Sequence, residues 1–151
     1  MIKHIKCDIF ESGADVICHQ VNCQGVMGSG IAKQVREKYP NVYAEYQTYC
    51  KAAKESMLGK VLIVPTEDGF SIANLFGQNN YGYDGNLYTS YEKLHECLEY
   101  VKAFGLNRTI AIPYLMGCYR GGGDWNVVYK MIEDLFGDSD CDILICEYNG
   151  G

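Results

Sequence analysis

Hydrophobic residues recur along the chain in two patterns, which alternate from one end to the other. Short runs rich in Ile, Val and Cys are typical of buried strands, whereas apolar positions three or four residues apart indicate amphipathic helices. Leu94, Leu98 and Val101, for example, fall on one face of the segment before Gly105. The patterns predict strands over 2–9, 15–21, 61–65, 71–76, 109–113 and 142–148, and helices over 31–39, 41–55, 90–104 and 124–136.

Turn and cap residues set the boundaries of these elements. Pro40 is expected to end the first helix, and Asn41 has the short polar side chain of an N-cap for the second. Thr89 or Ser90 is expected to cap the third helix, and Asp124 is a suitable cap for the fourth. The alternation of helices and strands predicts an α/β fold, with a central mixed sheet of about six strands and helices on both faces.

The length and composition are ordinary for a soluble globular protein. The chain has 151 residues, of which 48% are hydrophobic and 21% charged, and these values exclude intrinsic disorder, collagen and a coiled coil. No apolar run approaches the ~18 residues of a membrane span, and no secretory signal is visible, so we expect a cytoplasmic protein with no membrane partner. Since composition does not shift and no repeat or linker is visible, we expect one domain over residues 1–151.

Eight cysteines lie mostly within apolar segments, as Cys18 and Cys146 do, where a thiol packs like a small hydrophobic side chain. The sequence contains no Cys-x-x-Cys pair and no Cys/His spacing suited to zinc. We therefore expect free thiols in a reducing compartment, with no metal site and no other cofactor.

The formal net charge is −6, from 13 basic and 19 acidic residues. A nucleic-acid polymer requires a basic surface, so this charge disfavours such a partner. A small anionic ligand is compatible with the charge, because backbone N–H groups and helix N-termini bind phosphate without charged side chains.

Two glycine-rich loops, 22–30 and 117–123, are the strongest candidates for such a site. Each follows a predicted strand and precedes a predicted helix, and neither has the sequence of a P-loop or of a dinucleotide-binding motif. Glycine lets the backbone approach a phosphate closely, and two such loops at the carboxyl ends of strands converge on one crevice. The alternative is that these glycines only allow tight turns. Against it, the three consecutive glycines of 121–123 lose conformational entropy without an expected gain in packing.

The first loop also carries a family resemblance. Residues 22–32, Asn-Cys-Gln-Gly-Val-Met-Gly-Ser-Gly-Ile-Ala, resemble the first signature of the macrodomains. Residues 6–9 resemble the family's first-strand Gly-Asp-Ile element, with Cys7 in place of Gly, and 117–125 occupy the place of its second phosphate loop. The segment 19–22 and the Gly-Gly-Gly-Asp-Trp segment look most similar to small ADP-ribose 1″-phosphate phosphatases and their bacterial and phage relatives. The resemblance implies a three-layer α/β/α fold with a cleft for ADP-ribose.

The resemblance further implies roles for individual residues. Asp8, beside the backbone N–H of Ile9, would accept a hydrogen bond from the adenine amino group, the alternative being a surface aspartate in a turn. Asn22 would offer a donor and an acceptor to the distal ribose, or else be a turn residue bonded to its own backbone. Tyr148 would stack on adenine or else pack in the core. The distal phosphate and ribose would lie against Gly28, Ser29, Gly30 and Ile31. The diphosphate would lie against the backbone N–H groups of Gly117, Cys118, Tyr119, Arg120, Gly121, Gly122 and Gly123.

His19 and Asn22 are the candidate catalytic residues. His19 matches a histidine of the resembled phosphatases, and an imidazole with a pKa near neutrality could transfer a proton to a leaving ribose oxygen or activate a water. The alternative is a structural histidine with satisfied hydrogen bonds.

A different branch of the resembled family removes ADP-ribose from macromolecules, using a lysine before the third strand and an aspartate in the second loop. Here Gly121 occupies the aspartate position, and Lys54 and Lys60 only flank the lysine position. We therefore expect ADP-ribose binding and metal-independent hydrolysis of an ADP-ribose derivative, with ADP-ribose 1″-phosphate as the first candidate. Hydrolysis of ADP-ribosylated protein or nucleic acid, and a non-catalytic ADP-ribose-binding module, are the alternatives.

Overall fold

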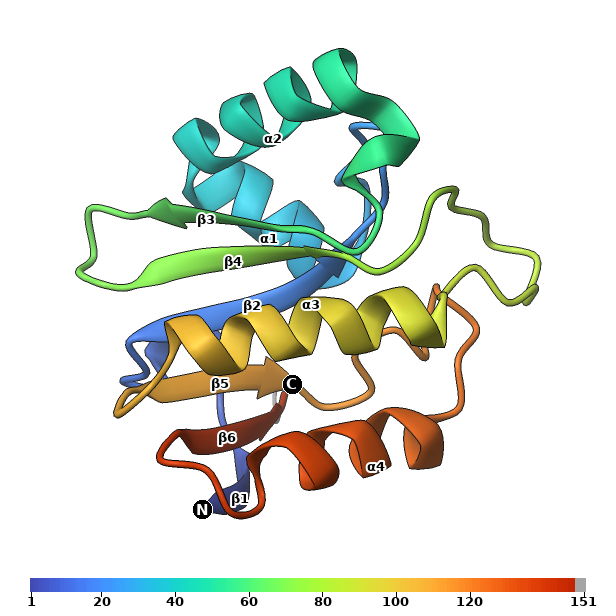
Figure 1. Ribbon diagram of the computed structural model, residues 1–151. Coiled ribbons are helices and arrows are strands. Elements are labelled where there is room, and N and C mark those ends of the chain that lie inside the picture. The colour runs from blue at the N-terminus through green and yellow to red at the C-terminus, as the bar shows by residue number, and fades with distance from the viewer. Residues whose placement is uncertain (149–151) are drawn as a thin grey trace.

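A six-stranded mixed sheet forms the centre of the structure, a computed structural model that describes residues 1–148 (Figure 1). The strand order is β1-β6-β5-β2-β4-β3. All neighbouring pairs are parallel except β3 with β4, which forms the predicted hairpin and makes the sheet mixed, as expected. The strands are β1 Ile2–Lys6, β2 Val16–Val21, β3 Val61–Pro65, β4 Ser71–Phe76, β5 Thr109–Pro113 and β6 Asp142–Glu147.

Helices cover both faces of the sheet, which confirms the three-layer α/β/α arrangement (Figure 1). One face packs against α1 and α2 through buried side chains such as Val35 and Val42. The other face packs against α3 and α4, through Leu98 and Ile132 among others. The helices are α1 Gly30–Lys38, α2 Pro40–Ala53, α3 Tyr91–Phe104 and α4 Trp125–Phe136, with short 3-10 helices η1 Ile9–Glu11 and η2 Lys54–Met57.

Strand β2 contributes to both halves of the core. Successive side chains of a strand point to opposite faces, so Ile17 and Val21 pack under α1 and α2, whereas Val16 and Cys18 pack under α3 and α4. Full burial of an aliphatic side chain such as Ile17 contributes about 1.5–3 kcal/mol. Because β2 pairs in parallel with both β4 and β5, the segments that follow these three strands start at the same edge of the sheet.

Several element boundaries differ from the sequence prediction. The first strand ends at Lys6 rather than at residue 9, because the Asp8 carboxylate accepts a hydrogen bond from the Phe10 N–H at 3.0 Å and starts η1. Pro40 does not end a helix but is the first residue of α2, where its missing N–H costs nothing. Tyr39 therefore takes the N-cap position that we had predicted for Asn41.

The two other predicted caps are present. Ser90 rather than Thr89 caps α3, since its hydroxyl accepts from the Lys93 N–H at 3.3 Å. Asp124 caps α4 by accepting from the Asn126 N–H at 2.9 Å. The eight cysteines are all unpaired, and no helix within residues 1–148 has the length and apolarity to cross a membrane.

Candidate functional site

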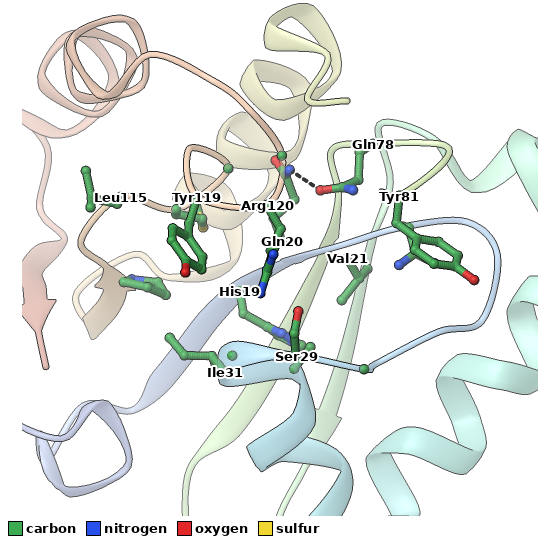
Figure 2. A pocket seen from close by; sticks show the side chains of 18 of the residues that line it. His19, Gln20, Val21, Ser29, Ile31, Gln78, Tyr81, Leu115, Tyr119 and Arg120 are labelled. Carbon is green, nitrogen blue, oxygen red and sulfur yellow. Dashed lines mark hydrogen bonds between the residues drawn. The ribbon is translucent and has the colours of Figure 1, made fainter. Parts of the chain in front are cut away.

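A pocket of about 360 Å³ opens at the edge of the sheet where β2 and β5 end (Figure 2). This volume lies within the range of small-molecule sites in proteins. The pocket is lined by both predicted glycine loops and by the segment 77–90, which follows β4. Three segments far apart in the sequence therefore meet at one site, as the position of their strands requires.

The first glycine loop connects β2 to α1 and forms one wall of the pocket. Six predicted site residues line this part: His19, Asn22, Gly28, Ser29, Gly30 and Ile31. Ser29 is the N-cap of α1, but its side chain makes no capping hydrogen bond. The first N–H groups of a helix have no partner inside the helix, so the start of α1 offers backbone donors and a positive dipole end to the pocket.

Asn22 organises the first loop through its side-chain amide. Its Oδ1 accepts from the Gln24 N–H at 3.0 Å and from the Tyr46 hydroxyl at 2.9 Å. Its Nδ2 donates to the Val26 carbonyl at 2.8 Å. Asn22 therefore makes the contacts of a turn residue, which was the alternative to ribose binding. Its Oδ1, the acceptor expected for a ribose hydroxyl, already has two donors.

Thr89 binds the second glycine loop at two positions, Gly117 and Gly121. The loop residues that line the pocket are Gly117, Tyr119, Arg120 and Gly121. The Thr89 hydroxyl donates to the Gly117 carbonyl at 2.6 Å, and its backbone N–H donates to the Gly121 carbonyl at 3.0 Å. The same hydroxyl accepts from Nε2 of Gln20 at 2.8 Å. Sequence reasoning missed both Thr89, seen only as a possible helix cap, and Gln20, which carries no local signal.

The consecutive glycines of the second loop have a packing reason. A Cβ on Gly121 would overlap the Thr89 hydroxyl, and a Cβ on Gly122 would overlap the Asn86 carbonyl. A Cβ on Gly123 would lie 2.7 Å from the carbonyl oxygen of Gly117. The expectation that these glycines bring no gain in packing is therefore wrong: they let the loop pack closely against the segment 77–90.

His19 lies in β2, on the same side of the pocket as Ser29 and Ile31 (Figure 2). Asn74, its neighbour on β4, donates through Nδ2 to the Leu62 carbonyl at 3.0 Å, so its Oδ1 faces Nε2 of His19 at 2.7 Å. Nε2 therefore carries the imidazole proton and donates it to Asn74. Nδ1 is left as an acceptor, buried and without a partner among residues 1–148.

Burial also sets the charge of His19, which is only 3% exposed. Desolvation lowers the pKa of His19 to about 4, against a smaller opposite effect of the hydrogen bond to Asn74. The expected pKa near neutrality is therefore wrong. At physiological pH, the ring is neutral, and its Nδ1, unpaired among residues 1–148, is a buried hydrogen-bond acceptor rather than an acidic group.

Other predicted site residues do not line the pocket: Asp8, Ile9, Cys118, Gly122, Gly123 and Tyr148. Asp8 and Tyr148 follow the neighbouring strands β1 and β6 at the same edge of the sheet. Tyr148 is 71% exposed, which excludes the alternative of core packing. Contacts of Asp8 and Tyr148 with adenine stay a prediction.

The model of the Macro domain family matches residues 18–132. The chain belongs to the macrodomain family. The match runs from β2 into α4 and includes both glycine loops.

Relatives of this macrodomain include hydrolases of two kinds. A DNA ADP-ribosyl glycohydrolase of Mycobacterium tuberculosis is 29% identical over 100% of the chain, which spans 43% of that protein's length. An ADP-ribose 1″-phosphate phosphatase of Scheffersomyces stipitis is 36% identical over 76 residues, 44% of each chain. The solved structure of Thermosipho africanus DarTG in complex with ADP-ribose has the same fold, with a TM-score of 0.80 and 21% identity over 98% of this chain and 42% of that one.

The buried neutral His19 gives the macrodomain a specific dependence of stability on pH. The unfolded chain protonates this ring with the ordinary pKa of 6.5, whereas the folded protein does so only near pH 4. The stability that depends on a neutral His19 is fully present above pH 6.5 and is lost as the pH falls to 4. This loss lowers the free energy of unfolding by about 3 kcal/mol. Chemical denaturation of His19→Asn at a series of pH values should show a correspondingly smaller loss. His95→Asn, which replaces an exposed histidine on α3, should lose as much stability as the wild type over this pH range. If His19→Asn did so too, His19 would not be the source of the pH dependence.

Glycines of the two loops should respond differently to substitution. Gly30 lines the pocket with φ +58° and has open space around it, so Gly30→Val should fill the pocket and abolish ligand binding with a moderate loss of stability. Gly122 has φ +73° and packs on the Asn86 backbone, so Gly122→Val should lower the melting temperature strongly. Thermal melts and ADP-ribose binding, measured on both variants, separate the two effects. Normal binding by a folded Gly30→Val variant would show that the first loop only forms a turn.

Proposed function

We propose that this macrodomain binds ADP-ribose and hydrolyses a phosphate ester at the distal ribose of an ADP-ribose derivative, without a metal ion. The observation that carries the proposal is the convergence of two glycine loops and the uncapped start of α1 on one pocket. Backbone N–H groups in this arrangement suit the phosphates of a nucleotide. The family membership and the ADP-ribose complex of a protein with the same fold support the ligand class.

The reacting end of the ligand would lie at the His19 side of the pocket. Nδ1 of His19 is a fixed acceptor there, oriented through the hydrogen bond of Nε2 to Asn74. Nδ1 is buried, so it would accept a hydrogen bond from the attacking water, or from a ribose hydroxyl, when the bound ligand brings that group against the ring. Water would then attack the phosphorus, the bond from phosphorus to the ribose oxygen would break, and that oxygen would take up a proton as inorganic phosphate leaves.

The start of α1 would stabilise the phosphate as this bond breaks. Its unpaired N–H groups include those of Gly30 and Ile31, which line the pocket beside His19. Fixed donors of this kind act without reorganisation, and the loss of a single one typically costs about 10²–10³-fold in rate. The pocket lining holds one imidazole and, within residues 1–148, neither a carboxylate nor a thiol, so its donor set does not favour a metal.

Removal of ADP-ribose from a nucleic acid is the second candidate, because the likeness to the glycohydrolase extends over the whole chain. The likeness to the phosphatases covers less of it, 44% for the Scheffersomyces stipitis protein and 68% for one of Saccharomyces cerevisiae. The lining argues for the first candidate nevertheless. No lysine and no acidic side chain of residues 1–148 lines the pocket, and neither Lys54 nor Lys60 reaches it. The lysine- and aspartate-dependent reaction expected for the second candidate therefore lacks its groups.

Asp8 would accept a hydrogen bond from the adenine end of the ligand. Asp8→Ala should weaken ADP-ribose binding by about 10- to 150-fold, because a hydrogen bond to a charged group would be lost. Asp15→Ala is a matched control, since the Asp15 carboxylate accepts from the Thr109 N–H at 2.9 Å, at the opposite edge of the sheet. Calorimetry should find wild-type affinity for this control. Equal affinity in both variants would remove Asp8 from the site, and no binding by the wild type at millimolar ADP-ribose would refute the proposed function.

Turnover on three substrates, each with EDTA present, decides between the candidates. The wild type should release inorganic phosphate from ADP-ribose 1″-phosphate faster than it releases ADP-ribose from ADP-ribosylated DNA or protein. His19→Ala should lower that rate at least about tenfold, with little change in ADP-ribose affinity, because a positioned proton acceptor is lost. His95→Ala, an exposed histidine on α3, should keep the wild-type rate. Faster turnover of the DNA substrate would favour the second candidate, and binding without turnover on any substrate would favour a binding module.

A further inference from the structure

Arg120 is the only charged side chain among the pocket-lining residues of the described chain, 1–148. No carboxylate in this part of the chain forms an ion pair with it. Its guanidinium lies instead over two tyrosine rings, 4.3 Å from the ring centre of Tyr83 and 5.0 Å from that of Tyr119. Stacking of this kind leaves the N–H groups at the guanidinium edge available for an anion.

The acidic residues nearest in sequence to Tyr83 and Arg120, Asp84 and Asp124, have hydrogen-bond partners of their own. Asp84 accepts from the Tyr88 hydroxyl at 2.9 Å and from the Asn86 N–H at 3.1 Å, and these hydrogen bonds lower the pKa of its carboxyl. Asp124 caps α4. Both carboxylates stay ionised, but within residues 1–148 neither forms an ion pair with Arg120, so its guanidinium has no direct anionic partner at the pocket.

The backbone that carries Arg120 is held in place. The next residue, Gly121, accepts hydrogen bonds at its carbonyl from the N–H groups of Tyr88 and Thr89, at 2.8 and 3.0 Å. The Arg120 side chain leaves this fixed loop and reaches the Tyr83 ring on the segment 77–90 (Figure 2 shows Arg120 and Tyr119 on the pocket wall). It thus links two of the three segments that form the pocket.

We propose that Arg120 is a specificity-determining residue, which binds a phosphate group of the ligand and makes the pocket select nucleotides by their negative charge. The proposal rests on the proposed function, because it takes the ADP-ribose class of ligand as given. Backbone N–H groups orient a phosphate but carry no net charge, whereas a guanidinium supplies the charge and two parallel donors. The contacts with the exposed rings of Tyr83 and Tyr119 favour a position of the guanidinium near the pocket before the ligand arrives.

Calorimetry with adenosine, AMP and ADP-ribose, and with ADP-ribose 1″-phosphate in the slow His19→Ala background, tests this role at two salt concentrations. Arg120→Gln should bind ADP-ribose at least about tenfold more weakly than the wild type and should show a weaker dependence on salt. Its affinity for uncharged adenosine should not change. A loss that is larger for the 1″-phosphate than for ADP-ribose assigns Arg120 to the terminal phosphate, and an equal loss assigns it to the diphosphate.

Two further variants separate charge from packing. Arg120→Lys keeps the charge but loses the planar stack, so it should retain most of the affinity. Arg108→Gln removes a guanidinium that lies 4.7 Å from the Phe104 ring centre outside the pocket, and it should bind every ligand as the wild type does. Equal losses of affinity in Arg120→Lys and Arg120→Gln, for adenosine as well as for the charged ligands, would show that Arg120 only packs between the two tyrosine rings. Wild-type ADP-ribose affinity in Arg120→Gln would overturn the proposal and leave the proposed function standing, whereas failure of the wild type to bind ADP-ribose would overturn both.

Discussion

The parallel pairing of β2 with both β4 and β5 is the constraint on which the site depends. It brings the ends of three strands, and the segments that follow them, to one edge of the sheet. It also places His19 opposite Asn74 in register, which supplies the partner of the buried imidazole. A slip of one residue would turn His19 to the other face of the sheet, so the packing of the core and the chemistry of the pocket specify the same register.

Burial determines what the pocket can do chemically. A histidine whose pKa lies near 4 is neutral at pH 7, and the direction of its hydrogen bond to Asn74 fixes which nitrogen is protonated. Its free nitrogen can therefore only accept a hydrogen bond. Under the proposed function, the charge on a bound phosphate would be met by the start of α1, by the loop backbone and by Arg120. The proposed mechanism thus assigns proton positioning and the stabilisation of negative charge to different groups.

The sequence predicted those features that depend on local pattern. Hydrophobic periodicity located all six strands and four helices, and glycine spacing located both loops. Contacts between distant segments could not be predicted: Gln20 and Thr89 are 69 residues apart, and Thr89 and Gly117 are 28 apart. The sequence also did not show that the Asn22 amide already has its hydrogen-bond partners or that His19 has a low pKa. Both properties depend on what the fold packs around these residues.

A glycine in a sequence signals close approach of the backbone to something, but not to what. Gly30, with open space around it, faces the pocket, whereas Gly121 and Gly122 face the segment 77–90. Glycine in the first loop thus leaves space in the pocket, whereas glycine in the second loop allows close packing against the segment 77–90. Because Gly121 is fixed by two hydrogen bonds to the segment 77–90, the base of the neighbouring Arg120 side chain needs little ordering when a ligand binds. Ordering a rotamer-rich side chain at an interface costs about 0.5–1.5 kcal/mol, so a guanidinium already stacked on two tyrosines begins with part of that cost removed. In the proposed role of Arg120, glycines that hold the loop against the segment 77–90 would in this way also raise the affinity for a phosphate.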